Sequence, residues 1–360
     1  MTKKSATIYD VAERAFVSIA TVSRVLNGSA HVRPETRERV EEVVRQLQFV
    51  PSAVAQSLSG GSRHSIGLAY PLDSDRSESS RSRLDDASVL YTDAIIRGAS
   101  WQASQVGYSL LSCAIEVGKD IQADPLQQLY AAVDGLILTD RVVNNIKSIR
   151  VAKRMNAVHL SGSGDEKFGG TIGVENGSAM RAMVAHLVEV HQYRDLGFVG
   201  GIVDSPDAVA RLEAFFAAAR AVGATVRPEN VLLGDYSSAR ASTAISERLS
   251  SPEPLPRVFV CANDQMALGV VRSLRAHGHV VPFDVAVTGF DDILLAAQLE
   301  PRLTTIRQPS FELGVAAVKM VIALLEGTVP VGSRETLPTE LVIRESCGCS
   351  DEIVRGVGTA

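Results

Sequence analysis

The chain has 360 residues, of which 46% are hydrophobic, and a formal net charge of −5. This length allows two or three domains of ordinary size, each with its own core. No apolar run reaches membrane-spanning length, and the first residues lack the apolar stretch of a secretory signal. We therefore expect a cytoplasmic protein without a membrane segment.

The charge is unevenly distributed. Residues 1–64 carry a net charge of +3, whereas the remaining residues carry −8. A basic end on an acidic body confines attraction for phosphate groups to that end.

The segment from Thr7 to Gly28 predicts two short helices joined by a tight turn. Thr7 can cap the first helix, because Asp10 follows three residues on and apolar residues then recur at the spacing of one helical face. Ser18 can cap the second helix, which we expect over 18–26.

The second helix is predicted to bury Val22, Val25 and Leu26. The residues left to point outward, most of them small or basic, are Ile19, Ala20, Thr21, Ser23 and Arg24. Such a helix fits the major groove of DNA, but any small helical bundle also contains a capped helix pair. Periodicity alone leaves both interpretations open.

A third helix is predicted over 32–47, with Pro34 in its first turn and an apolar face of valines and leucine that closes a three-helix core. After it, Pro51 and Gly60-Gly61 bound a stretch of about two helical turns. A helix this short is marginal alone. The stretch is therefore either a segment that orders against a partner or a plain linker that contains Leu58.

From Ser65 onward, short apolar strands alternate with helical stretches. We expect strands at 66–70, 108–113, 133–138, 157–160, 171–174, 196–199, 258–261, 285–288 and 341–344. Continuous apolar runs of this kind are typical of parallel sheets covered by helices on both faces. Their number favours two sheets, and two facing sheets predict a ligand cleft beyond the carboxyl ends of the strands.

The polar stretch 73–88 predicts a mobile loop after the first strand. It is either a lid over the ligand or a solvated loop without a function.

Polar side chains follow several of these strands. Asn263 and Asp264 follow one apolar run, and Asp291 and Asp292 follow another. Arg211 and Tyr236 lie in segments expected at the same edge. A guanidinium, an amide, a carboxylate and an aromatic ring suit a hydroxyl-rich or planar polar ligand. Any one carboxylate taken singly is more commonly a helix cap or a surface ion-pair partner.

Several strings resemble one family. S-x-x-T-V-S-R-V-L-N-G after D-V-A-E-R-A resembles the DNA-binding head of LacI/GalR regulators, and A-N-D-Q-M-A-L-G, V-P-F-D-V-A-V-T-G-F-D-D and P-R-L-T-T-I-R-Q-P resemble strings of its body. The resemblance implies an all-α helix-turn-helix DNA-binding head plus an α/β periplasmic-binding-protein-like body of two doubly wound parallel-sheet subdomains.

The resemblance also implies a division of the chain. It gives a head (1–49), a hinge helix with its linker (50–64), a body (65–350) and a tail (351–360). The first subdomain of the body would hold 65–175 and 307–337, and the second would hold 176–306 and 338–350. The three crossovers would form a hinge that closes like a jaw.

The family's DNA-contacting positions match a set in the head and hinge: Thr7, Ser18, Ile19, Ala20, Thr21, Ser23, Arg24, Asn27, Val54, Ala55 and Leu58. Leu58 would enter the minor groove and kink the DNA. The effector-binding positions match Tyr91, Arg211, Tyr236, Asn263 and Asp291.

The resemblance implies a homodimeric transcriptional regulator, acting as a repressor. It would bind a pseudo-palindromic double-stranded DNA operator, and a small effector, with a sugar favoured, would bind between the subdomains. We expect no catalytic residue, cofactor or metal. A dimer is favoured over a tetramer, because no leucine heptad follows the last strand.

Two other classes compete with a regulator. A sugar receptor of the transport type has a similar body but would need export. An enzyme on a doubly wound sheet would need phosphate or acyl-transfer motifs, and we find no G-x-x-x-x-G-K-[ST], no G-x-S-x-G and no helix-opening G-x-G-x-x-G.

Several positions depart from the family pattern. Phe16 replaces the usual turn glycine, so that either the turn adapts or Phe16 points outward at some cost. Glu175-Asn176 replaces the usual Asp-Asn, which we expect to affect local turns more than the cleft.

Of the four cysteines, Cys113 and Cys261 lie in apolar runs and should be reduced and buried. Cys347 and Cys349 form a C-G-C pair without a second pair at local ligand spacing. We expect a plain polar tail there rather than a zinc site.

Overall fold

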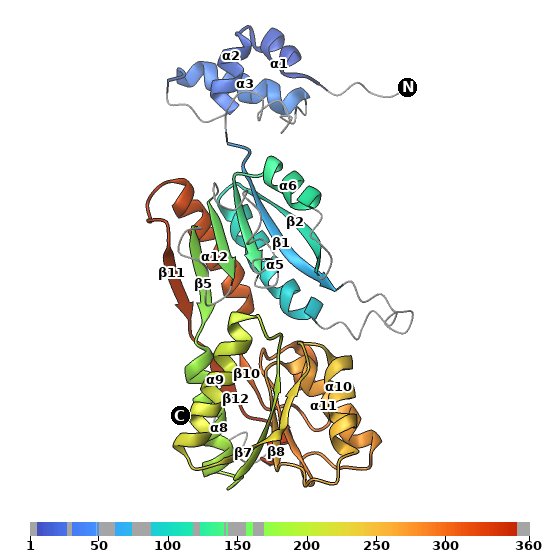
Figure 1. Cartoon of the computed structure of the whole chain (residues 1–360). Coiled ribbons are helices and arrows are strands. Elements are labelled where there is room, and N and C mark those ends of the chain that lie inside the picture. Colours follow the sequence, from blue (N-terminus) through green and yellow to red (C-terminus); the bar gives the residue numbers. More distant parts are fainter. Residues whose placement is uncertain are drawn as a thin grey trace. The chain divides into compact units, whose positions relative to one another are not determined.

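The computed structural model describes residues 6–26, 31–47, 49, 62–73, 88–117, 123–139, 142, 156–160 and 169–350. The chain folds as two units, Met1–Arg63 and His64–Ala360, which are drawn in Figure 1. The predicted hinge helix and the polar loop fall almost wholly outside the described residues. None of the described helices has the length and apolarity needed to cross a membrane.

The first unit contains three helices, α1 (Ile8–Ala15), α2 (Ile19–Leu26) and α3 (Pro34–Leu47). Both predicted caps are present, because Thr7 and Asp10 form a capping box and the Thr21 N–H donates to Ser18 Oγ over 3.2 Å. One residue set from all three helices forms the core: Val11, Ala12, Ala15, Val22, Val25, Val40 and Val43. The helical periodicity of the sequence therefore predicted this core correctly.

Phe16 ends α1 in a left-handed conformation, with φ 54° and an 89% exposed side chain. The Val17 N–H donates to Ala12 O over 3.1 Å, which closes the helix end as a glycine would at this position. The second of the two alternatives holds, because the backbone keeps the left-handed turn and the ring of Phe16 points into solvent.

The first sheet of the second unit is wholly parallel, in the order β11-β5-β4-β3-β1-β2. Its strands are β1 (Ser65–Asp73), β2 (Ser109–Val117), β3 (Gly135–Thr139), β4 (Ala157–Leu160), β5 (Gly170–Val174) and β11 (Ser333–Leu337). Helices α5 (Ser88–Gln105) and α12 (Ser310–Leu325) pack on one face with Leu68, and α6 (Ala123–Ala132) packs on the other with Ala69. Two buried faces explain the continuous apolar runs.

The second sheet is also parallel, in the order β7-β6-β8-β9. Its strands are β6 (Asp195–Gly200), β7 (Thr225–Leu233), β8 (Val258–Cys261) and β9 (Ala286–Thr288). Figure 1 shows α8 (Asn176–Glu189) and α9 (Pro206–Ala221) on one side of it, and α10 (Ser238–Leu249) and α11 (Asp264–Ala276) on the other. The two doubly wound sheets confirm the predicted fold class.

The last strand differs from expectation. β12 (Glu340–Val342) joins neither parallel sheet, because it pairs antiparallel with β10 (Thr305–Arg307). Leu341 and Ile343 still pack against the core of the second sheet. The segment therefore belongs to the second core by packing, but it forms part of the crossover between the sheets.

The sequence did not predict β7, β10 or β11. β7 and β11 lie at sheet edges and expose several side chains, so they lack the apolar run that marked the central strands. β10 has only three residues.

The expected polar tail at the C-G-C pair is wrong. Cys347 and Cys349 are 0% and 4% exposed and belong to the core of the second sheet. Cys347 ends η4 (Glu345–Cys347), a short 3-10 helix whose Ser346 is fully buried, and Cys349 follows two residues later.

Replacing Phe16 by Gly should stabilise the head by about 1 kcal/mol, because glycine adopts the left-handed conformation without a Cβ clash. Hydrogen exchange of the α1 and α2 amides in the full-length chain would slow about fivefold. Phe16→Ala is the matched control, since it removes the ring but keeps the Cβ. Equal protection in the two variants would contradict this account.

Candidate functional site

The buried side chain of Arg211 lies at the centre of the candidate site in the body. Ser205 caps α9, so that Arg211 falls on the second turn, where it is only 4% exposed. Its Nε donates to Asn176 Oδ1 over 2.8 Å, and its Nη1 donates to Ala262 O over 2.6 Å. The guanidinium carbon also lies 3.6 Å from the centre of the Phe290 ring. These contacts compensate the lost hydration of the charge.

Asn176 and Asp207 extend this network, and neither was among the predicted site residues. Asn176 Nδ2 donates to Asp207 Oδ1 over 2.8 Å, while its Oδ1 accepts from Arg211. Asn176 is 6% exposed. The residue that departs from the family pattern is Glu175, which is exposed and accepts a hydrogen bond from Ser178 Oγ over 3.0 Å, so its effect is on the local turn, as expected. The signal was present in the sequence, since Asn176 follows the β5 run as Asn263 follows β8.

Asp291 faces Arg211 from the loop after β9. Its Oδ1 lies 3.7 Å from Arg211 Nη1 and accepts a hydrogen bond from Gln308 Nε2. Burial raises the pKa of Asp291 to about 7, against the opposing effects of Arg211 and of the Gln308 hydrogen bond. Asp291 has a φ of 117°, a strained conformation for a residue with a side chain.

Tyr236 is held in a second strained turn. Asp235 and Tyr236 have φ values of 50° and 59°, and the Asp235 carboxylate accepts from Arg240 over 2.6 Å. The Tyr236 ring lies against Gly201, where an added Cβ would come within 2.3 Å of it. Gly201 is therefore needed for the ring to take this place.

Tyr91 reaches the site from α5, which packs on the first sheet. Burial raises the pKa of Tyr91, the charges of Asp207 and Asp291 add to the effect, and Arg211 opposes it. The neighbouring Leu90 packs against the core of the second sheet. The site thus combines groups from both subdomains.

The other three predicted polar residues have clear structural partners. Asn263 caps α11, because its Oδ1 accepts from the Met266 N–H over 2.9 Å. Asp264 is fully buried and accepts from Thr305 Oγ1 and from the Ile293 N–H.

Asp292 holds the crossover segments together. Its carboxylate lies 2.8 Å from Arg307 Nε and 2.7 Å from Arg344 Nη2. Asp264 and Asp292 therefore shape the framework around the site, and neither was among the five positions matched to effector binding.

Together these groups can recognise a polar, uncharged ligand. Arg211 and Asn176 offer N–H donors, Tyr91 and Tyr236 offer rings with hydroxyl groups, and Asp291 can donate or accept near neutral pH. Five predicted effector residues lie in or beside this cluster, including Asn263, which adjoins the Ala262 carbonyl that Arg211 contacts.

In the head, α2 carries the proposed base-reading side chains. Ile19 is 40% exposed, Ala20 and Arg24 are exposed, and Thr21 and Ser23 are half-buried. Thr7 and Ser18 use their hydroxyls as helix caps. Asn27, Val54, Ala55 and Leu58 lie outside the described residues, so their predicted DNA contacts stay predictions.

Comparison with known proteins identifies both parts of the chain. Residues 7–52 match the bacterial regulatory proteins of the lacI family, and residues 184–347 match the periplasmic binding protein-like domain. The transcriptional repressor CytR of Escherichia coli is 30% identical over 346 residues, which cover 95% of this chain and 96% of CytR. The chain belongs to the LacI family of transcriptional regulators.

Solved structures of LacI-family proteins agree. The lac repressor dimer bound to operator and an anti-inducer has a TM-score of 0.78 and 28% identity, covering 96% of this chain and 99% of that chain. The regulator CelR in complex with cellobiose has a TM-score of 0.67 and 25% identity, covering 95% and 99%. The similarity extends over head and body together, which decides against an enzyme and against a transport receptor.

The raised pKa of Asp291 predicts a pH dependence of stability. The folded chain binds this proton more tightly than the unfolded chain, so the stability it contributes is complete below about pH 4 and is lost as the pH rises through about 7. Relative to Asp291→Asn, the wild-type free energy of unfolding should therefore fall over this interval, by at most about 4 kcal/mol. Urea denaturation of both proteins at pH 4, 6 and 8 measures the difference, and a constant difference would refute the prediction.

Proposed function

We propose that this LacI-family regulator is a homodimeric repressor that binds a pseudo-palindromic operator and releases or retains it in response to a sugar-like effector. The proposal that an effector binds between the subdomains rests on the buried cluster around Arg211. Tyr91 belongs to this cluster from one subdomain and Asp291 from the other. A regulator that reads chromosomal DNA acts in the cytoplasm, and we assign it there.

The chemistry of the cluster favours a sugar. Vicinal hydroxyls match a guanidinium and a carboxylate placed side by side, and an aromatic ring covers the apolar face of a pyranose. The CelR structure holds cellobiose, which supports the same class for this chain. A planar nitrogen heterocycle would use similar groups and is the alternative that a ligand screen has to test.

The DNA part rests on the exposed face of α2. Two-fold symmetry of a dimer would present two such helices to two half-sites, as the lac repressor dimer bound to operator suggests. We assign most base contacts to Ile19, Ala20 and Arg24, and the central kink to Leu58.

Effector and operator would be coupled through the two subdomains. A ligand that contacts groups from both has a different affinity for the open and the closed arrangement, and that difference in affinity sets the largest shift it can cause. We propose that the shift changes the separation of the paired hinge segments and hence operator affinity.

The operator prediction concerns Arg24. A gel shift with genomic fragments at low salt should select a site whose footprint has two half-sites. Arg24→Ala should lower affinity for this site by about 10- to 100-fold, because a bidentate contact from arginine to guanine contributes about 1–3 kcal/mol.

The matched control is Arg275→Ala, which removes the same charge from the exposed end of α11 in the body. This variant should bind the operator as the wild type does. Failure of the wild type to retain any fragment would overturn the proposal, and equal losses in the two variants would overturn the assigned role of Arg24.

The effector prediction concerns Asp291. In a thermal-shift screen of sugars and nucleobases, a sugar should raise the unfolding midpoint. Asp291→Asn should weaken binding of that sugar by about 10-fold or more, since a hydrogen bond to a charged group contributes about 1.5–3 kcal/mol.

Asp284→Asn is the control, because Asp284 is exposed and its carboxylate accepts only the local Val280 N–H among the hydrogen bonds described. Binding of the sugar should be unchanged in this variant. A nucleobase hit that depends on Asp291 would replace the sugar class, whereas a hit that both variants bind normally would overturn the assigned site.

A further inference from the structure

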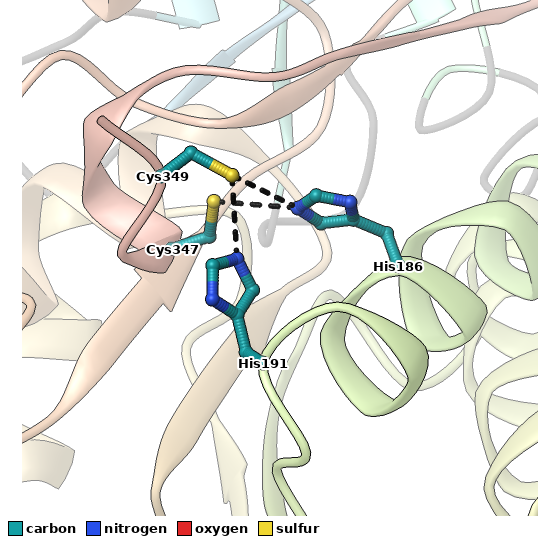
Figure 2. Close-up of side chains that lie close together, drawn as sticks. All are labelled: His186, His191, Cys347 and Cys349. Atoms are coloured by element: carbon teal, nitrogen blue, oxygen red, sulfur yellow. Dashed lines mark hydrogen bonds between the residues drawn. The ribbon is translucent and has the colours of Figure 1, made fainter. Parts of the chain in front are cut away.

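Two histidines and two cysteines converge at the end of the second subdomain, away from the cluster around Arg211. His186 lies in the last turn of α8, and His191 follows the end of that helix. Cys347 ends η4, and Cys349 follows two residues later. Their four ligand atoms all lie within 4.8 Å of one another (Figure 2).

The distances fit a tetrahedral metal site. His186 Nε2 lies 3.5 Å from Cys347 Sγ and 3.7 Å from Cys349 Sγ, and His191 Nε2 lies 3.4 Å from Cys349 Sγ. In a tetrahedral zinc site with Zn–S of about 2.3 Å and Zn–N of about 2.05 Å, neighbouring sulfur and nitrogen ligands are about 3.6 Å apart. The three measured separations lie on either side of this value.

Pairwise hydrogen bonds explain the cluster less well. His186 Nε2 faces two sulfur atoms, and Cys349 Sγ faces two nitrogens. A ring nitrogen carries one proton or one lone pair, so it can make one such bond at a time. Four atoms that each approach several others are instead the arrangement expected around one central cation.

Gly348 allows both sulfurs to face the histidines. It has a φ of 106°, and an added Cβ would lie 3.0 Å from Tyr193 Oη and 3.4 Å from His191 Nδ1. A side chain at this position would thus be strained in its backbone and crowded by the ring of His191. The C-G-C motif therefore has a geometric reason for its central residue.

Surrounding contacts fix the ligands. The His191 ring stacks on Tyr193 at 5.1 Å, and Tyr193 Oη donates to Cys347 O over 3.1 Å. Thr304 Oγ1 lies 3.1 Å from Cys347 Sγ. Ser346 Oγ donates to Val287 O over 2.6 Å, which holds η4 against β9. Such outer contacts orient ligands in metal sites.

We propose that His186, His191, Cys347 and Cys349 bind one Zn²⁺ ion in a closed, structural site. Four protein ligands leave no open coordination position for catalysis. Two thiolates and two imidazoles, without an oxygen ligand, exclude Mg²⁺ and Ca²⁺ as the preferred ion. Because all four atoms surround a single point, the site holds one ion rather than a two-iron cluster with cysteines and histidines on separate irons. Binding releases the two thiol protons to solvent.

The ion would join two segments that are about 160 residues apart in sequence. It would fasten the chain after β12, which forms part of the crossover between the sheets, to the carboxyl end of α8. The amino end of the same helix carries Asn176, which contacts Arg211. The proposed zinc site does not depend on the identity of the effector or of the operator.

The test measures metal content and stability of the full-length chain purified with a non-thiol reductant. After incubation with stoichiometric Zn²⁺ and desalting, elemental analysis should find about one zinc per chain in the wild type. Cys349→Ser and His191→Gln should each lower zinc affinity by about 10-fold or more, because each removes a ligand. Cys113→Ser, which removes a half-buried thiol outside the cluster, should retain the metal.

Two further measurements test the metal site even if Cys349→Ser does not fold. Co²⁺ added to the wild type should give the visible bands of a tetrahedral site with thiolate charge transfer, and His191→Gln should weaken them. A chelator should lower the unfolding midpoint of the wild type and of Cys113→Ser by more than that of His191→Gln. A reduced wild-type chain that binds no zinc, or a His191→Gln variant that keeps full zinc affinity, would overturn the proposal.

Discussion

A guanidinium removed from water has to be surrounded by acceptors, and this requirement organises the body. Arg211 is buried, so the amide of Asn176, the carbonyl of Ala262 and the carboxylate of Asp291 have to be brought to it. These groups come from the start of α8, the end of β8 and the loop after β9. The interaction therefore fixes the mutual position of the loops that form the candidate effector site.

Two of these loops are also strained. Asp235-Tyr236 and Asp291-Asp292 are consecutive non-glycine pairs with positive φ. Such conformations persist where surrounding contacts over-determine them, and here the ion pairs from Asp235 to Arg240 and from Asp292 to Arg307 do so. The strain presents Tyr236 and Asp291 to the same region, while their neighbours hold the backbone. Pre-organisation of this kind lowers the entropy lost when a ligand binds.

The sequence predicted most of the fold because the relevant signals are local. Helix caps at Thr7 and Ser18, the apolar stripe of the three head helices and the continuous runs of the central strands all depend on residues close in sequence. The edge strands β7 and β11 were not predicted, because they expose part of their side chains and have no continuous apolar run. The pairing of β12 with β10 was not predicted for another reason, because a strand of three residues is too short for a pattern that indicates its partner strand.

The sequence by itself determined the family, the fold class and the residue types of the candidate site, because signature strings and strand ends can be recognised without coordinates. Only the tertiary structure decided which of those residues meet. It brought Asn176 to Asp207 and Arg211, assigned Asp264 and Asp292 to the framework, and carried Cys347 and Cys349 to His186 and His191. Each of these contacts joins segments that the chain separates by 15 to more than 150 residues. These contacts depend on how the sheets and helices pack, and the spacing of the residues along the chain does not predict them.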